Sequence, residues 1–233
     1  MVRAQRDSIR LLQGALVAAI ALPLALFAYA CWFDYRTVHD NADKQIARTT
    51  DVLNEHALKV FEAVQRAIAE INEIVHDMPE SAIIAQQAEL HGRLRRIAEG
   101  SAQIKSLWIF DRNGRALVNS LSYPADSTNF ADRDYFAAHV EKDIGTYVGK
   151  VLRPRPPYGG APFFGVSRRR LSDEDGFTGV IQASLLPEYF EGFYEKLARD
   201  PGEYASIVRE DGSLLARYPS LGRDAKLAEQ GPL

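Results

Sequence analysis

The feature that most restricts the fold is an uncharged apolar segment near the N-terminus. Leu11 to Phe33 contains no charged residue across 23 positions. As a helix this segment would reach about 35 Å, enough to cross a hydrocarbon core of about 30 Å. Three arginines precede it, at positions 3, 6 and 10. The positive-inside bias therefore predicts a cytoplasmic N-terminus at residues 1–10, a transmembrane helix at 11–33, and an extracytoplasmic location for the residues after about 34.

A cleaved signal peptide is the competing interpretation of this segment. Ala28-Tyr29-Ala30 has the small-x-small form of a cleavage site, and Cys31 follows it directly. The apolar run is longer than the 7–15 residues of a typical signal peptide core. Its length favours a retained membrane anchor.

Composition excludes several classes of function. Cys31 is the only cysteine, and the five histidines show no ligand spacing, so we expect neither a metal site nor a cofactor. The net charge of -3 provides no global basic field, so we expect no nucleic-acid partner. The sequence also lacks Gly-x-Ser-x-Gly and a convincing Ser/His/Asp set, and we expect no enzyme active site in this segment.

Residues 34–78 are predicted to form one long helical stalk, because they include neither glycine nor proline. Two stripes recur at heptad spacing, which predicts a seam for a homodimer. The first comprises Ile46, Thr50, Leu53, Ala57, Val60, Val64, Ala67, Ile71, Ile74 and Met78, and the second Phe61, Ile68 and Val75. Both stripes could instead pack against the chain's own core. Pro79 is expected to end this helix, and residues 80–99 are predicted to form a shorter amphipathic helix.

Asn113-Gly114 and Asp211-Gly212 each separate two apolar runs, which predicts two β-hairpins. Further strands are predicted at 143–151, 163–170 and 177–186. The fold class is therefore α+β, with a five-stranded antiparallel sheet and helices in a module at 79–200. Residues 201–233 would begin a second, truncated module, and we expect the sequence to be part of a longer protein.

The candidate binding site is the segment Asn129–Phe136, which concentrates charge and aromatic rings. Arg133 supplies a planar bidentate donor suited to a small anion, and Tyr135 and Phe136 would complete the site. Alternatively, Arg133 pairs with Asp132 or Asp134 and only fastens the loop, while Phe136 belongs to the core. Weaker candidates, placed by strand position alone, are Tyr147, Phe164 and Arg168.

The combination of these motifs resembles the double Cache sensors, which are PAS-like extracytoplasmic domains of bacterial receptors. The similarity covers about residues 34–230 and includes the Asn-Gly hairpin, Asp132-Arg133-x-Tyr135-Phe136, and Ser167-Arg168-Arg169 followed by Asp175-Gly176-x-x-Gly179-Val180-Ile181. The resemblance implies a periplasmic ligand sensor anchored in the inner membrane, most similar to sensor histidine kinases. Diguanylate cyclases, chemoreceptors and a ligand-free dimerisation domain remain alternatives.

Two positions depart from the pattern of amino-acid-binding Cache domains. Thr128 stands where that pattern has a tyrosine, and Ser184 stands where it has the aspartate that holds the ligand amine. An ammonium group would then lack its counter-charge. We therefore expect a carboxylate or another small polar ligand without an amine, with Ser184 in the site.

Overall fold

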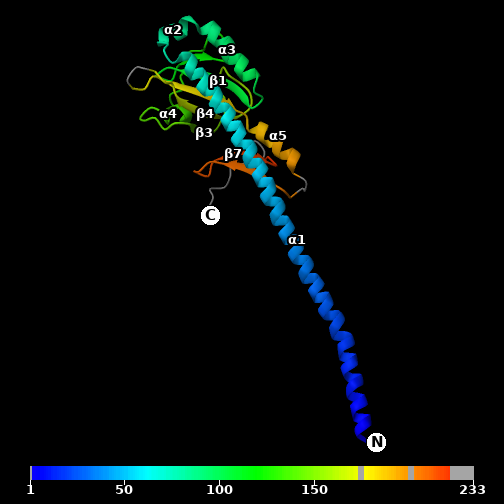
Figure 1. Ribbon diagram of the computed structural model, residues 1–233. Helices are drawn as coiled ribbons and strands as arrows, with labels where there is room; N and C mark the ends of the chain where they lie inside the picture. The colour runs from blue at the N-terminus through cyan, green and yellow to red at the C-terminus, as the bar shows by residue number, and fades with distance from the viewer. Residues whose placement is uncertain (1, 173–175, 199–201, 221–233) are drawn as a thin grey trace. The chain divides into compact units, whose positions relative to one another are not determined.

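The computed structural model describes the chain except residues 1, 173–175, 199–201 and 221–233. The side chains of residues 2–15 and 18 also lie outside the described part. The chain divides into two units, residues 1–54 and residues 55–233. Figure 1 shows the helices and strands in chain order.

The described residues of the first unit all belong to α1 (Val2–Val75), which continues through Pro23. Within the described residues, no helix has the length and apolar character needed to cross a membrane. The predicted span at 11–33 includes residues 11–15 and 18, whose side chains are outside the described part. The membrane anchor stays a prediction.

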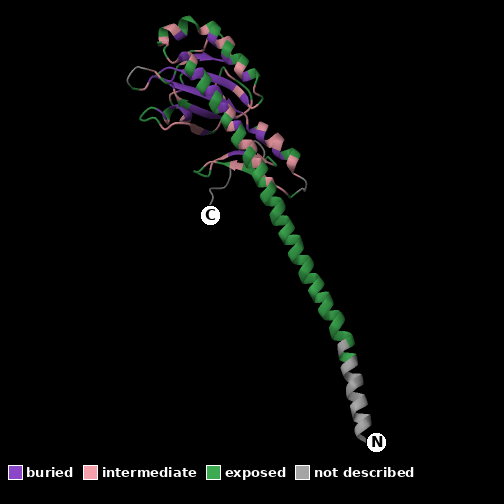
Figure 2. Cartoon of the chain, in the orientation of Figure 1, coloured by how far each residue is buried: buried purple, intermediate pink, exposed green. Residues whose placement is uncertain are grey.

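The second unit contains an antiparallel sheet of five strands in the order β2-β1-β5-β4-β3. The strands are β1 (Ile104–Phe110), β2 (Ala116–Asn119), β3 (Tyr147–Leu152), β4 (Phe163–Arg169) and β5 (Val180–Leu185). Figure 2 shows that the sheet is the most deeply buried part of this unit. The α+β class and the five-stranded sheet predicted from the sequence are confirmed.

The helices of this unit differ from the prediction at two places. α1 ends at Val75 rather than at residue 78, and a turn leads to Pro79, the N-cap of the next helix. The single helix predicted at 80–99 is two helices that meet at Gln86, whose backbone leaves the helical region. They are α2 (Glu80–Ala85) and α3 (Gln87–Glu99); α4 (Asp134–Ala137) and α5 (Pro187–Leu197) follow later in the chain.

The C-terminal part of α1 packs on one face of the sheet. Val64, Ile68 and Ile71 are fully buried, and Phe61 contacts the ring of Phe164 on β4 at 6.3 Å between centroids. Both apolar stripes therefore pack against the chain's own core from about Val60 onward, as the second interpretation of the stripes expected. Only the earlier part of the predicted dimer seam remains exposed, as Ile46 illustrates with 63% exposure.

The predicted second hairpin is present as β6 (Ala205–Val208) and β7 (Leu214–Tyr218), which form their own two-stranded sheet. The Arg209 guanidinium lies 5.3 Å from the centre of the Tyr147 ring on β3. Most of the remainder of the predicted second module, residues 221–233, lies outside the described part. That module stays a prediction.

The strand register assigns the side chains of β4 to the two faces of the sheet. Gly165 pairs with Ser184, and Phe164 pairs with Leu185. Because paired residues share a face and successive residues alternate, Phe164 points toward α1, and Phe163 and Gly165 point away from it. The face opposite α1 carries the candidate site.

Candidate ligand-binding site

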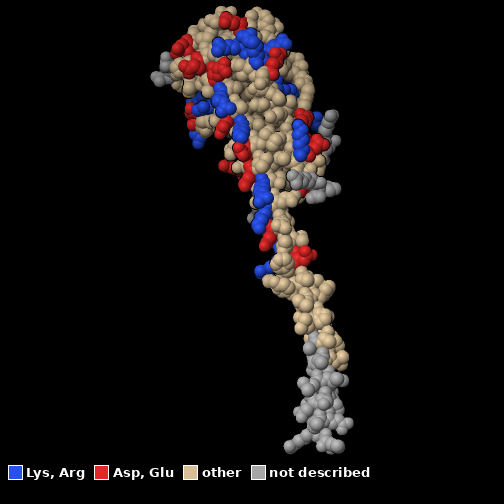
Figure 3. All heavy atoms as spheres, turned by 45° about the vertical axis from the view of Figure 1, so that its right-hand side comes forward, with Lys and Arg blue, Asp and Glu red and all other residues tan. Residues whose placement is uncertain are grey.

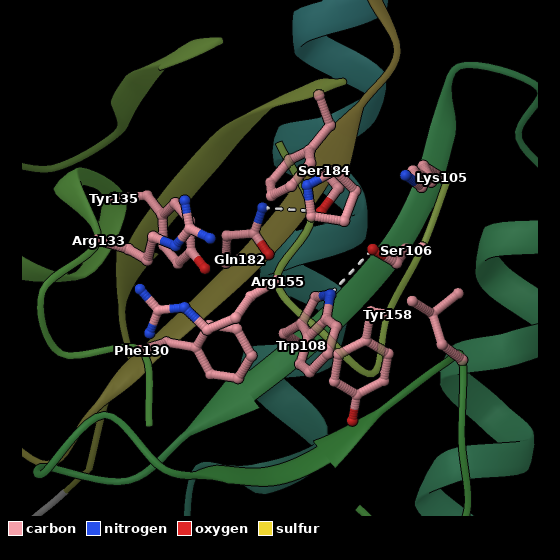
Figure 4. A pocket seen from close by; sticks show the side chains of 14 residues that line it. Lys105, Ser106, Trp108, Phe130, Arg133, Tyr135, Arg155, Tyr158, Gln182 and Ser184 are labelled. Atoms are coloured by element: carbon pink, nitrogen blue, oxygen red, sulfur yellow. Dashed lines mark hydrogen bonds between the residues drawn. The ribbon is translucent and has the colours of Figure 1, made fainter. Parts of the chain in front are cut away.

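A pocket lies on the face of the sheet opposite α1, and its free space is about 30 Å³. Residues from β1, β4, β5, α4 and the β3–β4 loop converge on it, as Figure 4 shows. The lining residues are Lys105, Ser106, Trp108, Leu121, Phe130, Arg133, Tyr135, Pro154, Arg155, Tyr158, Gly159, Phe163, Gln182 and Ser184.

The predicted site segment is held against the first hairpin turn. Gly114 has a φ of +80°, which favours glycine, and a Cβ there would lie 2.5 Å from the backbone nitrogen of Ala131. The Phe130 N–H donates to the Gly114 carbonyl at 2.8 Å, and the Asn129 side chain donates to the Asn113 carbonyl at 2.8 Å. The turn at Asn113-Gly114 thus holds in place the loop that leads into α4.

Tyr135 forms part of the pocket wall, and its position depends on a glycine in β4. A Cβ at Gly165 would lie 3.0 Å from the Tyr135 ring and 3.0 Å from the Gln182 side-chain nitrogen. Only 3% of Tyr135 is exposed, and this burial raises the pKa of its hydroxyl well above the usual value. The hydroxyl therefore stays neutral and can donate a hydrogen bond.

Arg133 lines the pocket and has an unused donor. Its Nη2 donates to the Arg153 carbonyl at 3.2 Å, whereas its Nε is buried and has no hydrogen-bond partner among the described residues. The alternative role, pairing with a neighbouring acid, is not observed. Asp132 pairs with Arg155 at 2.7 Å, and Asp134 accepts the backbone N–H of Lys150 at 2.6 Å.

Two further cations line the pocket, and neither was predicted. Lys105 donates from Nζ to the Ala161 carbonyl at 2.8 Å, and burial lowers the pKa of its ammonium group. Arg155 makes a two-pronged contact with the Asp132 carboxylate, with N–O distances of 3.1 and 2.7 Å. No aspartate or glutamate of the described chain lines the pocket, so its charge favours an anion.

The floor of the pocket consists of neutral side chains on β1 and β5. Trp108 donates from Nε1 to the Ser106 hydroxyl at 2.9 Å, and Gln182 donates to the Ser184 hydroxyl at 3.1 Å. Both contacts appear as dashed lines in Figure 4. Ser184 therefore lies in the pocket, where the sequence placed it.

Solved structures with the same arrangement are extracellular sensor domains. The extracellular domain of rpHK1S-Z16, described as a histidine kinase, is 28% identical with a TM-score of 0.61, over 72% of this chain and 66% of that domain. The ligand-binding domain of the Campylobacter jejuni chemoreceptor Tlp3, in complex with 4-methylisoleucine, is 13% identical with a TM-score of 0.56, over 78% of this chain and 75% of that domain. The module has the Cache sensor fold. The resemblance stated from the sequence is confirmed.

A third structure extends the comparison. An extracellular ligand binding receptor from Desulfohalobium retbaense is 11% identical with a TM-score of 0.56, over 71% of this chain and 29% of that receptor. No family model and no curated protein matches the sequence. This chain spans just under two thirds of the histidine-kinase domain, 66% of its length.

Four of the predicted site residues lie outside the pocket of the Cache module. Phe136 is core, 1% exposed, with its ring edge-on to Phe110 and Phe177. Phe164 and Arg168 belong to the other face of β4, where Phe164 packs on α1 and Arg168 is exposed. Tyr147 packs beside the aromatic core and under Arg209. Arg133, Tyr135 and Ser184 are the predicted residues that the structure brings together.

The sequence contained a signal for some of the residues that we missed. Gln182 stands two positions before Ser184, so once Ser184 is placed in the pocket, strand alternation places Gln182 there too. The same rule, applied with the β4–β5 register, selects Phe163 instead of Phe164. For Arg155 and Tyr158 no comparable signal exists, because prolines and glycines indicate a loop but not its path.

A buried polar network lies directly behind the pocket wall of the Cache module. The Ser167 hydroxyl donates to the Tyr135 carbonyl at 2.8 Å, so the contact at 3.0 Å between His139 Nε2 and Ser167 Oγ requires His139 to donate. His139 is fully buried, and its Nδ1 has no partner among the described residues. Burial lowers the pKa of His139 below the 6.5 of a free histidine, and the nearby carboxylate of Asp143 opposes this only in part.

We expect the free energy of unfolding to decrease as the pH falls below about 6.5, because His139 then binds a proton more readily in the unfolded state than in the folded state. Chemical denaturation at pH 7.5 and pH 5 measures this change. His139→Gln retains a donor but does not titrate, and it should flatten the pH dependence. His56, whose pKa burial also lowers, would leave a residual slope. An unchanged slope in the variant would contradict the assignment to His139.

Proposed function

We propose that this chain is the extracytoplasmic sensor region of a transmembrane signal-transduction receptor, and that its Cache module binds a small anionic ligand. The observation that carries the proposal is the charge of the pocket. Lys105, Arg133 and Arg155 line it, and no acidic residue of the described chain does. The buried Nε of Arg133 lacks a partner, which a ligand carboxylate would supply.

The pocket favours a ligand without an amine. The Tlp3 chemoreceptor domain was solved with 4-methylisoleucine and with L-valine, which carry both a carboxylate and an ammonium group. In this chain Gln182 and Ser184 form a neutral floor. An ammonium group would lose its hydration without gaining a counter-charge, and that loss is costly in a buried site. A carboxylate fits these surroundings better.

The N-terminal part of α1 would anchor and pair the receptor. Residues 11–33 contain no charge, and Figure 3 shows the described part of this segment without blue or red spheres. Of the first apolar stripe, Ile46 is 63% exposed and Thr50 is also exposed, and this early part of the stripe would form the seam with a second copy. Ligand binding would bias the two states of this helix pair, with a coupling free energy of about 1–3 kcal/mol.

The output would be a histidine kinase, encoded beyond this segment. The support is the 28% identity to the extracellular domain described as belonging to a histidine kinase. The chemoreceptor Tlp3 has the same fold at 13% identity, so fold alone does not separate the two outputs. The sensor module itself needs no catalytic residue in either case.

Thermal unfolding of the purified chain with and without candidate ligands tests the sensor role. At a concentration 100 times the dissociation constant, a ligand adds about 2.7 kcal/mol to the free energy of unfolding and raises the midpoint accordingly. We expect carboxylates to raise the midpoint, and L-isoleucine and polyamines to leave it unchanged. Stabilisation by L-isoleucine alone would contradict the argument from Ser184. No stabilisation by any of these compounds would contradict the sensor role of the pocket.

A further inference from the structure

The cationic side chains of the pocket can bind one ligand carboxylate rather than two. Arg155 is already neutralised by the Asp132 carboxylate, 2.7 Å away, and Lys105 donates to a backbone carbonyl at 2.8 Å. The Arg155 contact also lowers the pKa of Asp132, which therefore remains charged at neutral pH. Among the three cationic side chains that line the pocket, only Arg133 has a buried N–H without a partner in the described structure. A single anionic head group would satisfy it.

Five aromatic side chains also line the pocket. Tyr158 lies edge-on to Trp108, with 4.8 Å between ring centroids and an interplanar angle of 84°, and Phe130 is tilted against Trp108 at 5.3 Å. On the other side, Tyr135 and Phe163 are tilted against each other at 6.5 Å. Edge-on and tilted rings at these distances are the arrangement in which aromatic groups attract one another.

The polar atoms of two of these rings are already bonded within the protein. Trp108 donates to Ser106, and the Tyr158 hydroxyl lies 3.2 Å from the Ser122 hydroxyl. These rings therefore present apolar surface to the pocket instead of hydrogen-bonding groups. A flat apolar body would complement this wall, and an extended polar chain would leave its own polar groups unpaired.

The free space of about 30 Å³ is smaller than a six-membered ring, so part of the wall must move when such a ligand enters. Tyr158 belongs to the β3–β4 loop, is only partly buried, and is joined to the body through Ser122 and Asn119 at 3.2 and 3.4 Å. These two contacts are long for hydroxyl hydrogen bonds and would be weak. Tyr158 is thus the wall residue that an entering ring displaces and then packs against.

We propose that the ligand is an aromatic monocarboxylate whose carboxylate binds Arg133 and whose ring packs between Trp108, Phe130 and Tyr158. This inference rests on the proposed sensor function and specifies its ligand. The carboxylate supplies the acceptor that Arg133 Nε lacks, and the ring replaces solvent between aromatic side chains. Neither part of the ligand alone satisfies both halves of the pocket.

Calorimetric titration of the purified chain with benzoate tests the inference, with three compounds that each change one property. Benzamide has the ring without the charge, cyclohexanecarboxylate has the charge without a planar ring, and succinate has two carboxylates. We expect benzoate to bind about 5-fold more tightly than cyclohexanecarboxylate, the factor that ring–ring contacts provide. Benzamide should bind at least about 10-fold more weakly than benzoate, since a charged hydrogen bond contributes at least that factor. Succinate should also bind at least about 10-fold more weakly, because its second carboxylate would lose its hydration without gaining a cationic partner.

A variant of the wall residue separates the ring contact from the charge contact. Tyr158→Leu should lower the preference for benzoate over cyclohexanecarboxylate from about 5-fold to about 2-fold, because Trp108 and Phe130 still contact the ring, while leaving the affinity for cyclohexanecarboxylate within about 2-fold. Circular dichroism of the free variant verifies that it is folded. Binding of succinate or cyclohexanecarboxylate as tight as that of benzoate would overturn this inference and leave the sensor function standing. Absence of binding by every carboxylate would overturn both.

Discussion

Replacing Phe164 by alanine is expected to lower the free energy of unfolding by about 3–5 kcal/mol, the usual cost of removing a buried phenylalanine. Phe164 has no exposed surface, and its ring lies 6.3 Å from that of Phe61 on α1 and 5.9 Å from that of Phe190 on α5. It therefore joins the sheet to α1 and α5. The cavity left by alanine would lie at their junction, where three elements would have to move to fill it.

Phe163→Ala is the matched control, because it removes the same atoms from the neighbouring residue on the opposite face. Phe163 is 8% exposed and lines the pocket, so the smaller loss of packing should give a smaller loss of stability. Urea denaturation compares the two variants, and ligand titration below the unfolding transition gives the second readout. Phe163→Ala should weaken ligand binding, and Phe164→Ala should not. The reverse result would show that the assignment of the two faces is wrong.

This pair of residues also shows why the sequence predicted the strand but not its face. Alternation identifies a buried face only when the other face is exposed to water. The first five residues of β4 are all buried, and so is every residue of β5, so their sequences carry no such contrast. The face is decided by the register between β4 and β5, which pairs Gly165 with Ser184. That register depends on the whole sheet rather than on local sequence.

The hairpins and the site segment were easier to predict, because their signals are local. Asn113-Gly114 determines a turn by itself, and the dense charge of Asn129–Phe136 singled out a segment of which Phe130, Arg133 and Tyr135 line the pocket. What closes the pocket is not local. Arg155 reaches Asp132 across 23 positions of sequence, and Tyr158 reaches Asn119 across 39. A loop rich in proline and glycine has no periodicity from which such contacts could be inferred.

The apolar stripes of α1 show a third limit on what can be predicted from the sequence. Heptad spacing predicts that a helix buries one side, but it does not identify what covers that side. Val64 and Ile71, from one stripe, and Ile68, from the other, are all buried within the chain's own module. The exposed stripe residues before about 57 are the only part of the pattern left for a second copy. The sequence pattern predicts which face of a helix is buried, but the tertiary structure determines which element packs against that face.

Arg133→Ala is expected to weaken binding of a carboxylate ligand by about 1.5–3 kcal/mol, or roughly 10- to 150-fold, the contribution of hydrogen bonds to a charged group. The reason is that Arg133 Nε is buried without a partner, whereas Arg155 and Lys105 already have acceptors within the protein. The stability of the free protein should change little, since Arg133 makes only one hydrogen bond, of 3.2 Å, in the described structure.

Arg168→Ala provides the charge-matched control for this variant. Arg168 is exposed and belongs to the other face of β4, so its loss should leave the affinity unchanged within about 2-fold if the long-range charge effect is screened by salt. Arg133→Lys keeps the charge but loses the planar fork, and it should recover only part of the affinity. Calorimetric titration in 0.15 M salt measures the ligand affinity of all three variants.

Equal losses of affinity in the two alanine variants would mean that the pocket attracts anions by general charge alone. Full recovery of the affinity with lysine would mean that a point charge is enough. The pattern we expect, a large loss, no loss and a partial recovery, would assign the carboxylate to the guanidinium of Arg133.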